Sequence, residues 1–330
     1  MRALVTGGCG YVGSHAVREL TASGHEVLLY DNLSSGHRKF SEGYKFIEAD
    51  IANETRMAEA LKGIDAVMHF AASAYFGESV ANPREYFRNN VEAAIKLLDA
   101  VLATSARLFI FSSTCATYGI PQTLPLTESH PQAPINPYGA TKLFFEHVLA
   151  AYSVSHGLRS VSLRYFNAAG AHADGSIGEL HDPETHLIPL ALKAALGAAP
   201  LLKIFGNHFN TPDGTCIRDY IHVSDLGRAH VLALDYLAKG GETTCLNLGT
   251  GEGTSVAAAG SRSGRSHWAK SASLLHRPEA QRPSRLVRRS QARRKGVGLA
   301  ADTRPPRNSR FRLEMGAKAR GFGSSVVKLG

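Results

Sequence analysis

The chain has 330 residues and a formal net charge of +9, a length that allows one or two domains. It holds no stretch of about 18 apolar residues, so we expect no membrane-spanning helix. The four cysteines, Cys9, Cys115, Cys216 and Cys245, are scattered and form no CxxC pair. This usage favours a reducing, cytoplasmic compartment, and we predict no metal site.

The basic excess is confined to one end of the chain. Residues 257–330 hold 18 Lys and Arg against 3 Asp and Glu, whereas residues 1–256 hold 19 against 25. The body of the chain is therefore mildly acidic. A nucleic-acid partner would depend on the tail alone, which lacks a recognisable motif and interleaved aromatic residues, so we expect none.

The first apolar run, Arg2–Thr6, predicts a buried strand. Gly7, Gly10 and Gly13 follow it, and Ala16–Ser23 has helical character. Glycines between a strand and a helix let the backbone turn tightly and approach a pyrophosphate, which the N–H groups of the helix N-terminus then bind. This arrangement predicts a dinucleotide-binding site.

A second strand is predicted over His25–Tyr30, with Asp31 at its end. Asp31 follows Gly13 by 18 residues, close to the spacing of the acid that binds an adenosine ribose. Its carboxylate would repel a 2′-phosphate, which favours NAD over NADP. A role as a turn residue or helix cap is the alternative.

Strands and helices continue to alternate, which predicts βαβ units and a parallel sheet covered on both faces. The expected fold class is α/β, a Rossmann-type doubly wound sheet with site residues at the strand ends. Helical periodicity covers Glu85–Leu102, and we interpret His69 as structural. Further strands are predicted at Tyr44–Glu48, Asp65–His69, Leu108–Phe111 and Ser160–Arg164.

A Tyr and a Lys lie four residues apart after Asn136-Pro137. If Tyr138 opens a helix, Lys142 lies one turn along on the same face. A phenol has a reference pKa near ~10, and a neighbouring ammonium lowers it. The pair is therefore a candidate proton-transfer device at neutral pH. Thr114 follows the fifth strand, so its hydroxyl and the phenol are expected to converge over a nicotinamide.

The periodicity weakens in the second half, where Pro, His and Gly are frequent between Gly170 and Pro189. We interpret residues 1–168 as an NAD-binding domain, residues 169–256 as a substrate-binding α/β region interleaved with the last sheet strands, and residues 257–330 as an atypical tail. Helices are predicted at His186–Leu196 and Asp225–Leu237, and strands at Leu201–Phe205 and Thr244–Leu248.

A series of motifs occurs in order and at natural spacing: TGGCGYVGSH, YDNLSSG, HFAAS, NNV, FSSTCATYG, NPYGATK, RYFNAAG and RDYIHVSDL. Together they resemble the extended short-chain dehydrogenase/reductase superfamily and, within it, the UDP-glucose 4-epimerase family. The resemblance covers about residues 2–256. It implies tightly bound NAD and reversible hydride transfer at hexose carbon 4, which interconverts UDP-glucose and UDP-galactose through a 4-keto sugar.

The resemblance also assigns roles to single residues. Tyr138 matches the catalytic base, Thr114 the catalytic Ser/Thr, and Lys142 the group that holds the phenol pKa down. The implied NAD contacts are Gly7, Gly10, Tyr11, Val12, Gly13, Asp31, Asn32, Leu33, Ser34, Ser35, Gly36, Asp50, Ile51, Phe70, Ala71, Ala72, Ser73, Ala74, Asn89, Thr114, Tyr138, Lys142 and Phe166. The implied UDP-sugar contacts are Thr114, Tyr138, Asn167, Lys203, Ile204, Phe205 and Arg218.

Several readings stay open beside this one. Arg218 could instead form a surface ion pair with Asp219 or Asp225, and the place of Ala74 is often a Lys in the family. A 4,6-dehydratase would carry an acidic pair directly after Thr114, where this chain has Cys115-Ala116. Related epimerases act on other UDP-sugars, and a non-catalytic NAD sensor would tend to lose the Tyr, Lys or hydroxyl that this chain keeps. The family also implies a homodimer, formed through helices near Glu85–Leu102 and Lys142–His156.

The resemblance ends abruptly after Val256. A family member would continue with an amphipathic helix, an Arg-Pro-Gly-Asp-like segment and an LGWxP region, whereas residues 257–330 are rich in Arg, Ser, Ala and Gly and hold the only Trp, Trp268. A disordered basic tail is one explanation. We favour a frame shift just after Val256, because GC-rich DNA read out of frame gives this composition. The chain as printed would then be a catalytically impaired NAD-binding protein.

Sequencing the DNA from codon 245 to the stop, and translating all three frames, tests the frame-shift hypothesis. We expect another frame to encode an amphipathic helix followed by Arg-Pro-Gly-Asp and LGWxP. If no other frame contains these motifs, the hypothesis is wrong and the tail is an unrelated basic segment.

Overall fold

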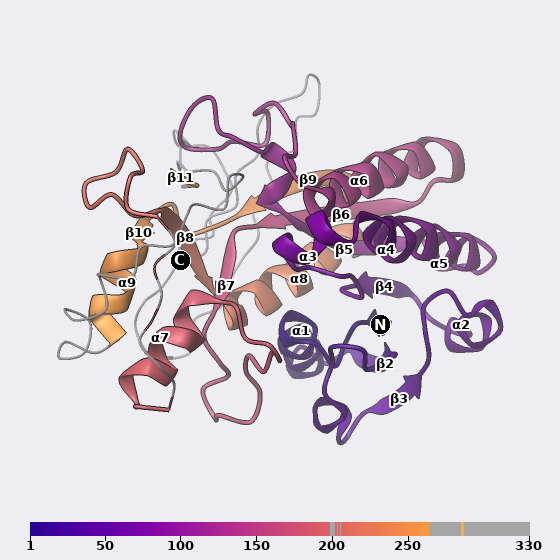
Figure 1. The fold of residues 1–330 in the computed structure, drawn as a ribbon. Helices are drawn as coiled ribbons and strands as arrows, with labels where there is room; N and C mark the ends of the chain where they lie inside the picture. Colours follow the sequence, from indigo (N-terminus) through magenta and orange to yellow (C-terminus); the bar gives the residue numbers. More distant parts are fainter. Residues whose placement is uncertain (199–201, 203, 205, 264–284, 287–330) are drawn as a thin grey trace.

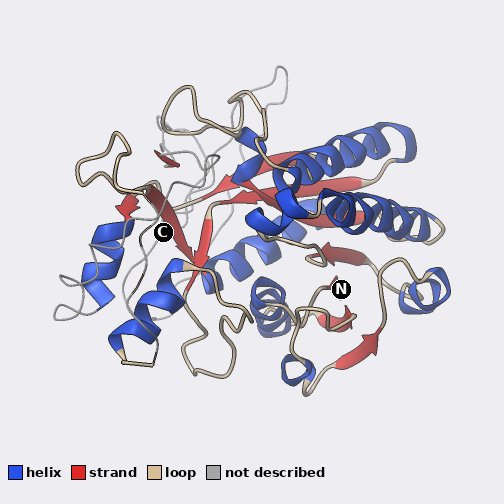
Figure 2. Ribbon diagram, in the orientation of Figure 1, coloured by secondary structure: helices blue, strands red, loops and turns tan. Residues whose placement is uncertain are grey.

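The computed structural model describes residues 1–198, 202, 204, 206–263 and 285–286, and its centre is a parallel sheet of seven strands (Figures 1 and 2). The strand order is β3-β2-β1-β4-β5-β6-β9, so the chain reverses its direction of progress between β1 and β4. In such sheets the reversal opens a crevice at the carboxyl ends of the strands. The strands are β1 Arg2–Thr6, β2 Glu26–Asp31, β3 Lys45–Glu48, β4 Ala66–His69, β5 Leu108–Thr114, β6 Arg159–Tyr165 and β9 Thr244–Leu248.

Helices cover both faces of the sheet because its strands are apolar on both sides. On one face Leu29 packs in a buried cluster with Leu20 and Leu234. On the other face Phe109 packs with Leu97. The predicted doubly wound α/β fold is confirmed. The first face carries α1 Tyr11–Ala22 and α8 Val223–Ala238, and the second carries α2 Glu54–Ala60, α4 Pro83–Phe87, α5 Ala93–Leu102 and α6 Pro137–His156.

A smaller sheet lies beside the large one (Figure 1). Its central strand, β8, pairs with β7 and β11 in parallel and with β10 in antiparallel orientation. None of the described helices is long and apolar enough to cross a membrane. The remaining elements include α3 Phe76–Ala81, β7 Asn167–Ala169, α7 Leu187–Ala195, β8 Ile217–His222, β10 Gly253–Ser255, α9 Val256–Ser263 and β11 Arg285–Leu286.

The predicted helical segment Glu85–Leu102 is helical throughout, but it is not uniformly α-helical. It runs through α4, a π-helical turn over Arg88–Glu92, and α5, and the sequence analysis did not predict the π turn. The wider turn carries Asn90 into a buried position beside Ser73, and such π turns are frequent at functional sites.

Two further predictions are not decided by the structure. The predicted strand Leu201–Phe205 falls largely outside the described residues, because residues 201, 203 and 205 are not described. The division into residues 1–168, 169–256 and 257–330 stays a prediction.

A buried ion pair joins α6 to β6. Glu146 on α6 receives hydrogen bonds from Arg164 on β6 at 2.6–3.1 Å, and their side chains are 2% and 6% exposed. Ser113 also donates to Glu146 at 2.5 Å, and Arg164 donates to the Tyr118 hydroxyl at 2.8 Å. The network satisfies charges that would otherwise be costly to bury, and it fixes α6 against β5 and β6.

We expect Arg164→Met to lower the free energy of unfolding by about 3–5 kcal/mol, because it leaves the Glu146 carboxylate buried without its charge partner. The double variant Glu146→Leu/Arg164→Met should recover much of this loss. Arg56→Met, which breaks an exposed pair with Glu59, is the control and should cost about 1 kcal/mol or less. Urea unfolding measures all three, and an Arg164→Met loss no larger than the control would contradict the role of the pair.

Candidate active site at the carboxyl edge of the sheet

The glycine-rich turn between β1 and α1 is packed as closely as a backbone allows. Gly7 has a φ of +71°, and a Cβ there would lie 2.5 Å from the backbone nitrogen of Ala71. A Cβ on Gly13 would lie 2.2 Å from the Gly7 carbonyl oxygen. A Cβ on Gly10 would meet only that same oxygen, at 3.3 Å. Of these three glycines, only Gly10 therefore has room for a side chain in the protein alone.

The N-terminus of α1 is suited to an anion. The first turn of a helix leaves N–H groups without intrahelical partners. Gly10, at the N-cap, provides no side-chain cap, and no acidic residue lies in the first turn. The positive end of the helix dipole adds to these donors. This turn fits the pyrophosphate of a dinucleotide, as the glycine spacing predicted.

Asp31 ends β2 and supports the glycine turn. Its carboxylate accepts hydrogen bonds from the backbone N–H of Cys9 at 3.0 Å and of Leu33 at 2.8 Å. Burial raises the pKa of this carboxyl group, and the two N–H donors oppose that shift. Gly36 lies against it, since a Cβ there would be 3.0 Å from both carboxylate oxygens. The turn-bracing role left open by the sequence is present, and each oxygen keeps a lone pair for a further donor.

The adjacent loop after β3 is joined to the same region. Asp50 accepts a hydrogen bond from Asn32 at 2.8 Å and caps its own turn by accepting from the N–H of Ala52. Tyr30 donates to the Asp50 carbonyl oxygen at 2.9 Å. Ile51 is buried beside them. The two segments that the sequence assigned to the adenosine half of NAD therefore lie together.

The loop Phe70–Ala74, after β4, is held by a residue that the sequence analysis missed. Asn90 accepts from the Ser73 N–H at 2.8 Å, donates to the Ser73 carbonyl at 2.9 Å, and donates to Thr141 on α6 at 3.2 Å. Asn89, the predicted contact, donates to the Ser73 hydroxyl. The motif NNV contained the signal, but only the π turn shows which amide points inward.

The predicted catalytic residues come together at the ends of β5 and α6. Thr114 is the last residue of β5, and Tyr138 is the second residue of α6, whose first N–H groups are capped by Asn136. The Thr114 hydroxyl interacts with the Tyr138 phenol. Lys142 lies one turn further along α6, with its Nζ atom 5.9 Å from the centre of the Tyr138 ring.

Lys142 is buried, and its ammonium has local partners. Nζ donates to the Ser112 carbonyl at 2.9 Å and lies 4.8 Å from the centre of the Phe111 ring. Burial nevertheless lowers the pKa of Lys142 to about 7, and Glu146 opposes that shift. At neutral pH Lys142 is therefore only partly protonated, and its Nζ atom is held by β5.

The expected lowering of the Tyr138 pKa by Lys142 is not found in the protein alone. Burial raises the pKa of Tyr138 well above its ordinary value, Tyr165 adds to the rise, and the Thr114 hydroxyl opposes it. The physical reason is desolvation, which disfavours both the phenolate and the ammonium. Proximity in sequence predicted the pair, but not the depth at which it is buried.

The residues predicted to hold the substrate follow β6 and lie on β8. Phe166 is buried near the end of β6, and Asn167 donates from its amide to the Asp219 carbonyl at 2.9 Å. Arg218 donates to the Ile217 carbonyl at 3.0 Å. Of the predicted segment Lys203–Phe205, only Ile204 is among the described residues, and it is half-buried.

The acidic neighbours considered as alternative partners of Arg218 interact with other groups. The Asp219 carboxylate accepts from Thr250 and Gly251 at 2.7–2.9 Å, and Asp225 pairs with Arg228 at 3.3 Å. The four cysteines are free thiols. His69 is buried and bonded to Thr6 at 2.8 Å, which agrees with a structural role.

Fold and site together define the class. A glycine-rich turn at the switch point of a parallel sheet, with a Tyr, a Lys and a hydroxyl at the carboxyl edge, is the arrangement of a nucleotide-dependent oxidoreductase-type enzyme. Residues 3–249 match the model of the NAD dependent epimerase/dehydratase family, and the chain belongs to that family. The NAD cofactor predicted from the sequence is thereby confirmed.

Individual relatives extend the comparison. A UDP-glucose 4-epimerase of Rhizobium meliloti is 54% identical over 255 residues, which are 77% of this chain and 78% of that protein. The crystal structure of UDP-glucose 4-epimerase from Brucella ovis in complex with NAD is 48% identical with a TM-score of 0.80, over 87% of this chain and 89% of that one. The crystal structure of UDP-glucose 4-epimerase from Bifidobacterium longum in complex with NAD+ and UDP is 32% identical with a TM-score of 0.79, over 88% of this chain and 90% of that one.

The low pKa of Lys142 predicts a specific pH dependence of stability. The unfolded chain keeps the Lys142 proton up to its ordinary pKa of 10.5, whereas the folded protein releases it near 7. Between these values the unfolded state binds more protons, so the free energy of unfolding rises with pH, by up to about 1.4 kcal/mol per pH unit from this group.

Lys142→Met should remove that rise. Urea unfolding of nucleotide-free protein at about pH 7 and about pH 9 measures it, with exposed Lys62→Met as the control. Parallel pH profiles for Lys142→Met and the unmodified chain would contradict the assignment.

Proposed function

We propose that this protein interconverts UDP-glucose and UDP-galactose through a 4-keto sugar. The observation that carries the proposal is the meeting of Thr114, Tyr138 and Lys142 at the carboxyl edge of the sheet, beside a turn that fits a dinucleotide. The relatives named UDP-glucose 4-epimerase, one of them solved with NAD+ and UDP, support the substrate class.

Different segments at the carboxyl edge of the sheet would bind different parts of the cofactor. The N-terminus of α1 would bind the pyrophosphate, Asp31 and the Asn32–Asp50 contact the adenosine half, and the Phe70–Ala74 loop the nicotinamide half. NAD held there would supply the acceptor and donor of the hydride. Because Asn90 fixes Ser73 through two hydrogen bonds, the loop is held ready for the cofactor.

Tyr138 is the group that moves the proton. Its phenolate would take the proton from the 4-hydroxyl of the hexose and return it after the keto sugar has turned. Thr114 would hydrogen-bond the same oxygen and align it with the phenol. Lys142 is buried one turn beyond Tyr138, and we assign it no contact with the sugar; in its protonated form it would hold positive charge 5.9 Å from the centre of the Tyr138 ring and favour the phenolate.

The substrate must be held by its diphosphate while the hexose turns. Arg218 and Asn167 are the described residues that we assign to this task, with Ile204 along the uridine. A guanidinium matches phosphate oxygens in fork geometry. Cys115 and Ala116 begin a 3₁₀ turn directly after Thr114, so no carboxylate stands where a dehydratase needs one, which favours epimerisation.

The assembly and compartment predicted from the family stay predictions. A homodimer through α4, α5 and α6 agrees with the exposure of Phe144 and Val154 on α6, which are 50% and 91% exposed. We expect a cytoplasmic protein. The Rhizobium meliloti relative is matched over 78% of its length. The activity of this chain therefore depends on whether its residues 257–330 can take the place of the part that is not matched.

We expect Tyr138→Phe to lower kcat for UDP-galactose epimerisation by about 10²–10⁴-fold, because it removes the proton-transfer group and little else. NAD content and melting temperature should be unchanged. Tyr152→Phe, which removes another α6 phenol bonded to Asp99, is the matched control. A Tyr138→Phe enzyme with the kcat of the unmodified chain would show that another residue is the base.

Gly10→Ala tests the cofactor site separately. Its Cβ meets only the Gly7 carbonyl at 3.3 Å, so the protein should fold normally but bind NAD at least about tenfold more weakly, a loss of about 1.4 kcal/mol. Gly13→Ala, with its Cβ 2.2 Å from the same oxygen, should lose stability as well. Calorimetric titration and thermal melts distinguish the two, and unchanged NAD affinity in Gly10→Ala would place the pyrophosphate elsewhere.

A further inference from the structure

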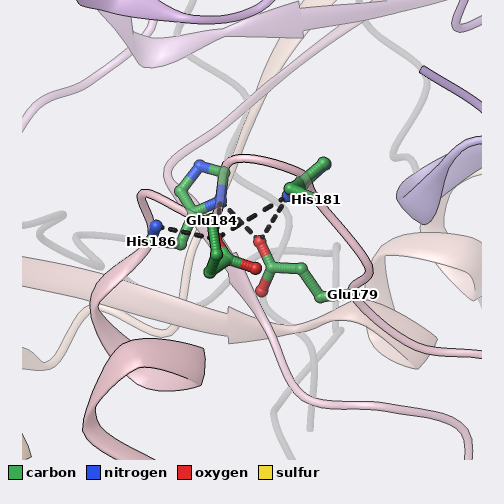
Figure 3. Close-up of side chains that lie close together, drawn as sticks. All are labelled: Glu179, His181, Glu184 and His186. Carbon is green, nitrogen blue, oxygen red and sulfur yellow. Dashed lines mark hydrogen bonds and ion pairs between the residues drawn. The ribbon is translucent and has the colours of Figure 1, made fainter. Parts of the chain in front are cut away.

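Four metal-ligating side chains meet in one short segment between β7 and α7, away from the catalytic residues in sequence. Glu179, His181, Glu184 and His186 each offer one donor atom, and these atoms all lie within 4.8 Å of one another (Figure 3). The spacing is E-x-H-x-x-E-x-H. The sequence analysis noted the frequency of histidine here but predicted no metal site.

The two carboxylates are almost fully enclosed. The side chains of Glu179 and Glu184 are 6% and 5% exposed. Among the residues that the structure describes, the ion-pair partners found for both are the imidazoles of His181 and His186. Two buried carboxylates need compensating positive charge. A bound divalent cation, with the two imidazoles as ligands, would supply that charge.

The distances between donor atoms bracket those expected around a small tetrahedral cation. Zn²⁺ binds nitrogen and carboxylate oxygen at about 2.0–2.2 Å, which separates the donors of a tetrahedron by about 3.4 Å. Here His Nδ1 and Glu Oε1 atoms are separated by 2.5, 3.1, 3.5 and 3.9 Å. Small movements of the four side chains therefore place every donor at bonding distance from a central ion.

Backbone and aromatic groups already orient two of the ligands. The Glu184 carboxylate accepts from the N–H groups of Thr185 and His186, both at 2.8 Å. The His181 ring contacts Tyr11 and Tyr75 edge-on, at 6.2 and 5.7 Å between ring centres. Such outer contacts fix ligand orientation in metal sites.

We propose that Glu179, His181, Glu184 and His186 bind one Zn²⁺ or a similar divalent transition metal ion. Two imidazole nitrogens and two carboxylate oxygens suit this class of ion better than Mg²⁺ or Ca²⁺, which prefer oxygen alone. Four protein ligands leave no open position, so the site is structural rather than catalytic.

The ion would stabilise the segment before α7 in its position against Tyr11 and Tyr75, near the predicted cofactor site. Tyr11, the first residue of α1, donates to the Gly170 carbonyl at 2.7 Å, and His37 contacts the Leu180 carbonyl at 2.5 Å. With the cluster closed on a metal ion, His181 and His186 would be fixed against the rings of Tyr11 and Tyr75. The proposal does not depend on which UDP-sugar is bound.

The full-length, untagged chain is treated with a chelator and then titrated with Zn²⁺ or Co²⁺. We expect one ion per chain by elemental analysis, a Co²⁺ absorption spectrum of the tetrahedral type, and a higher melting temperature with metal. His181→Gln and Glu184→Gln should each abolish all three signals. His172→Gln is the matched control, because His172 pairs with Asp174 at 2.8 Å in the same region but outside the cluster.

The wild-type measurement alone can overturn the proposal, even if a variant fails to fold. Less than one tightly held ion per chain, or only the octahedral spectrum of free aqueous Co²⁺, means that the four side chains pair with one another and form no tetrahedral metal site. If His181→Gln binds metal as well as the unmodified chain does, the ion lies elsewhere and the proposal is wrong. The proposal is also wrong if His172→Gln loses metal binding to the same extent as the cluster variants. None of these readouts uses epimerase activity, so they stand apart from a failure of the proposed function.

Discussion

The structure depends on the polar groups that α6 carries into the core. Lys142 donates to the Ser112 carbonyl, and one turn later Glu146 receives Arg164 from the neighbouring strand. A buried charge without its partner costs several kcal/mol, so only one rotation and one depth of the helix satisfy both residues. That constraint also places Tyr138, one turn before Lys142, at the end of β5. The packing that stabilises the fold and the geometry of the site therefore have the same cause.

The features that could be predicted from the sequence are those that local spacing determines. A strand, three glycines and a helix at the N-terminus, Asp31 after the second strand, and a Tyr four residues before a Lys each refer to neighbours within one βα unit. The parallel sheet then brings the strand ends to one edge, as β1, β4, β5 and β6 pair in register. Much of the candidate site could be predicted without coordinates because Asp31 and Thr114 end strands and the glycine turn follows one.

The features that could not be predicted from the sequence depend on contacts between different helices, strands and loops. Asn90 is distinguished from Asn89 only by a π turn that points it towards Ser73. The Glu146–Arg164 pair requires the register of a helix on a strand. The cluster of Glu179 and its neighbours consists of donors whose spacing resembles an ordinary polar loop until the segment folds over the α1 N-terminus. Motif spacing records none of these.

Burial gives the catalytic pair a property that neither residue has alone. Desolvation raises the pKa of Tyr138 and lowers that of Lys142 to about 7, so near neutral pH the folded site resists forming a phenolate. Any positive charge that enters the crevice acts on the phenol through a poorly screened environment, where charge interactions are stronger than in water. Basicity at Tyr138 is thus conditional on what occupies the crevice. A site built in this way takes a proton efficiently only when a cationic partner is beside the phenol, which limits proton removal to the fully assembled complex.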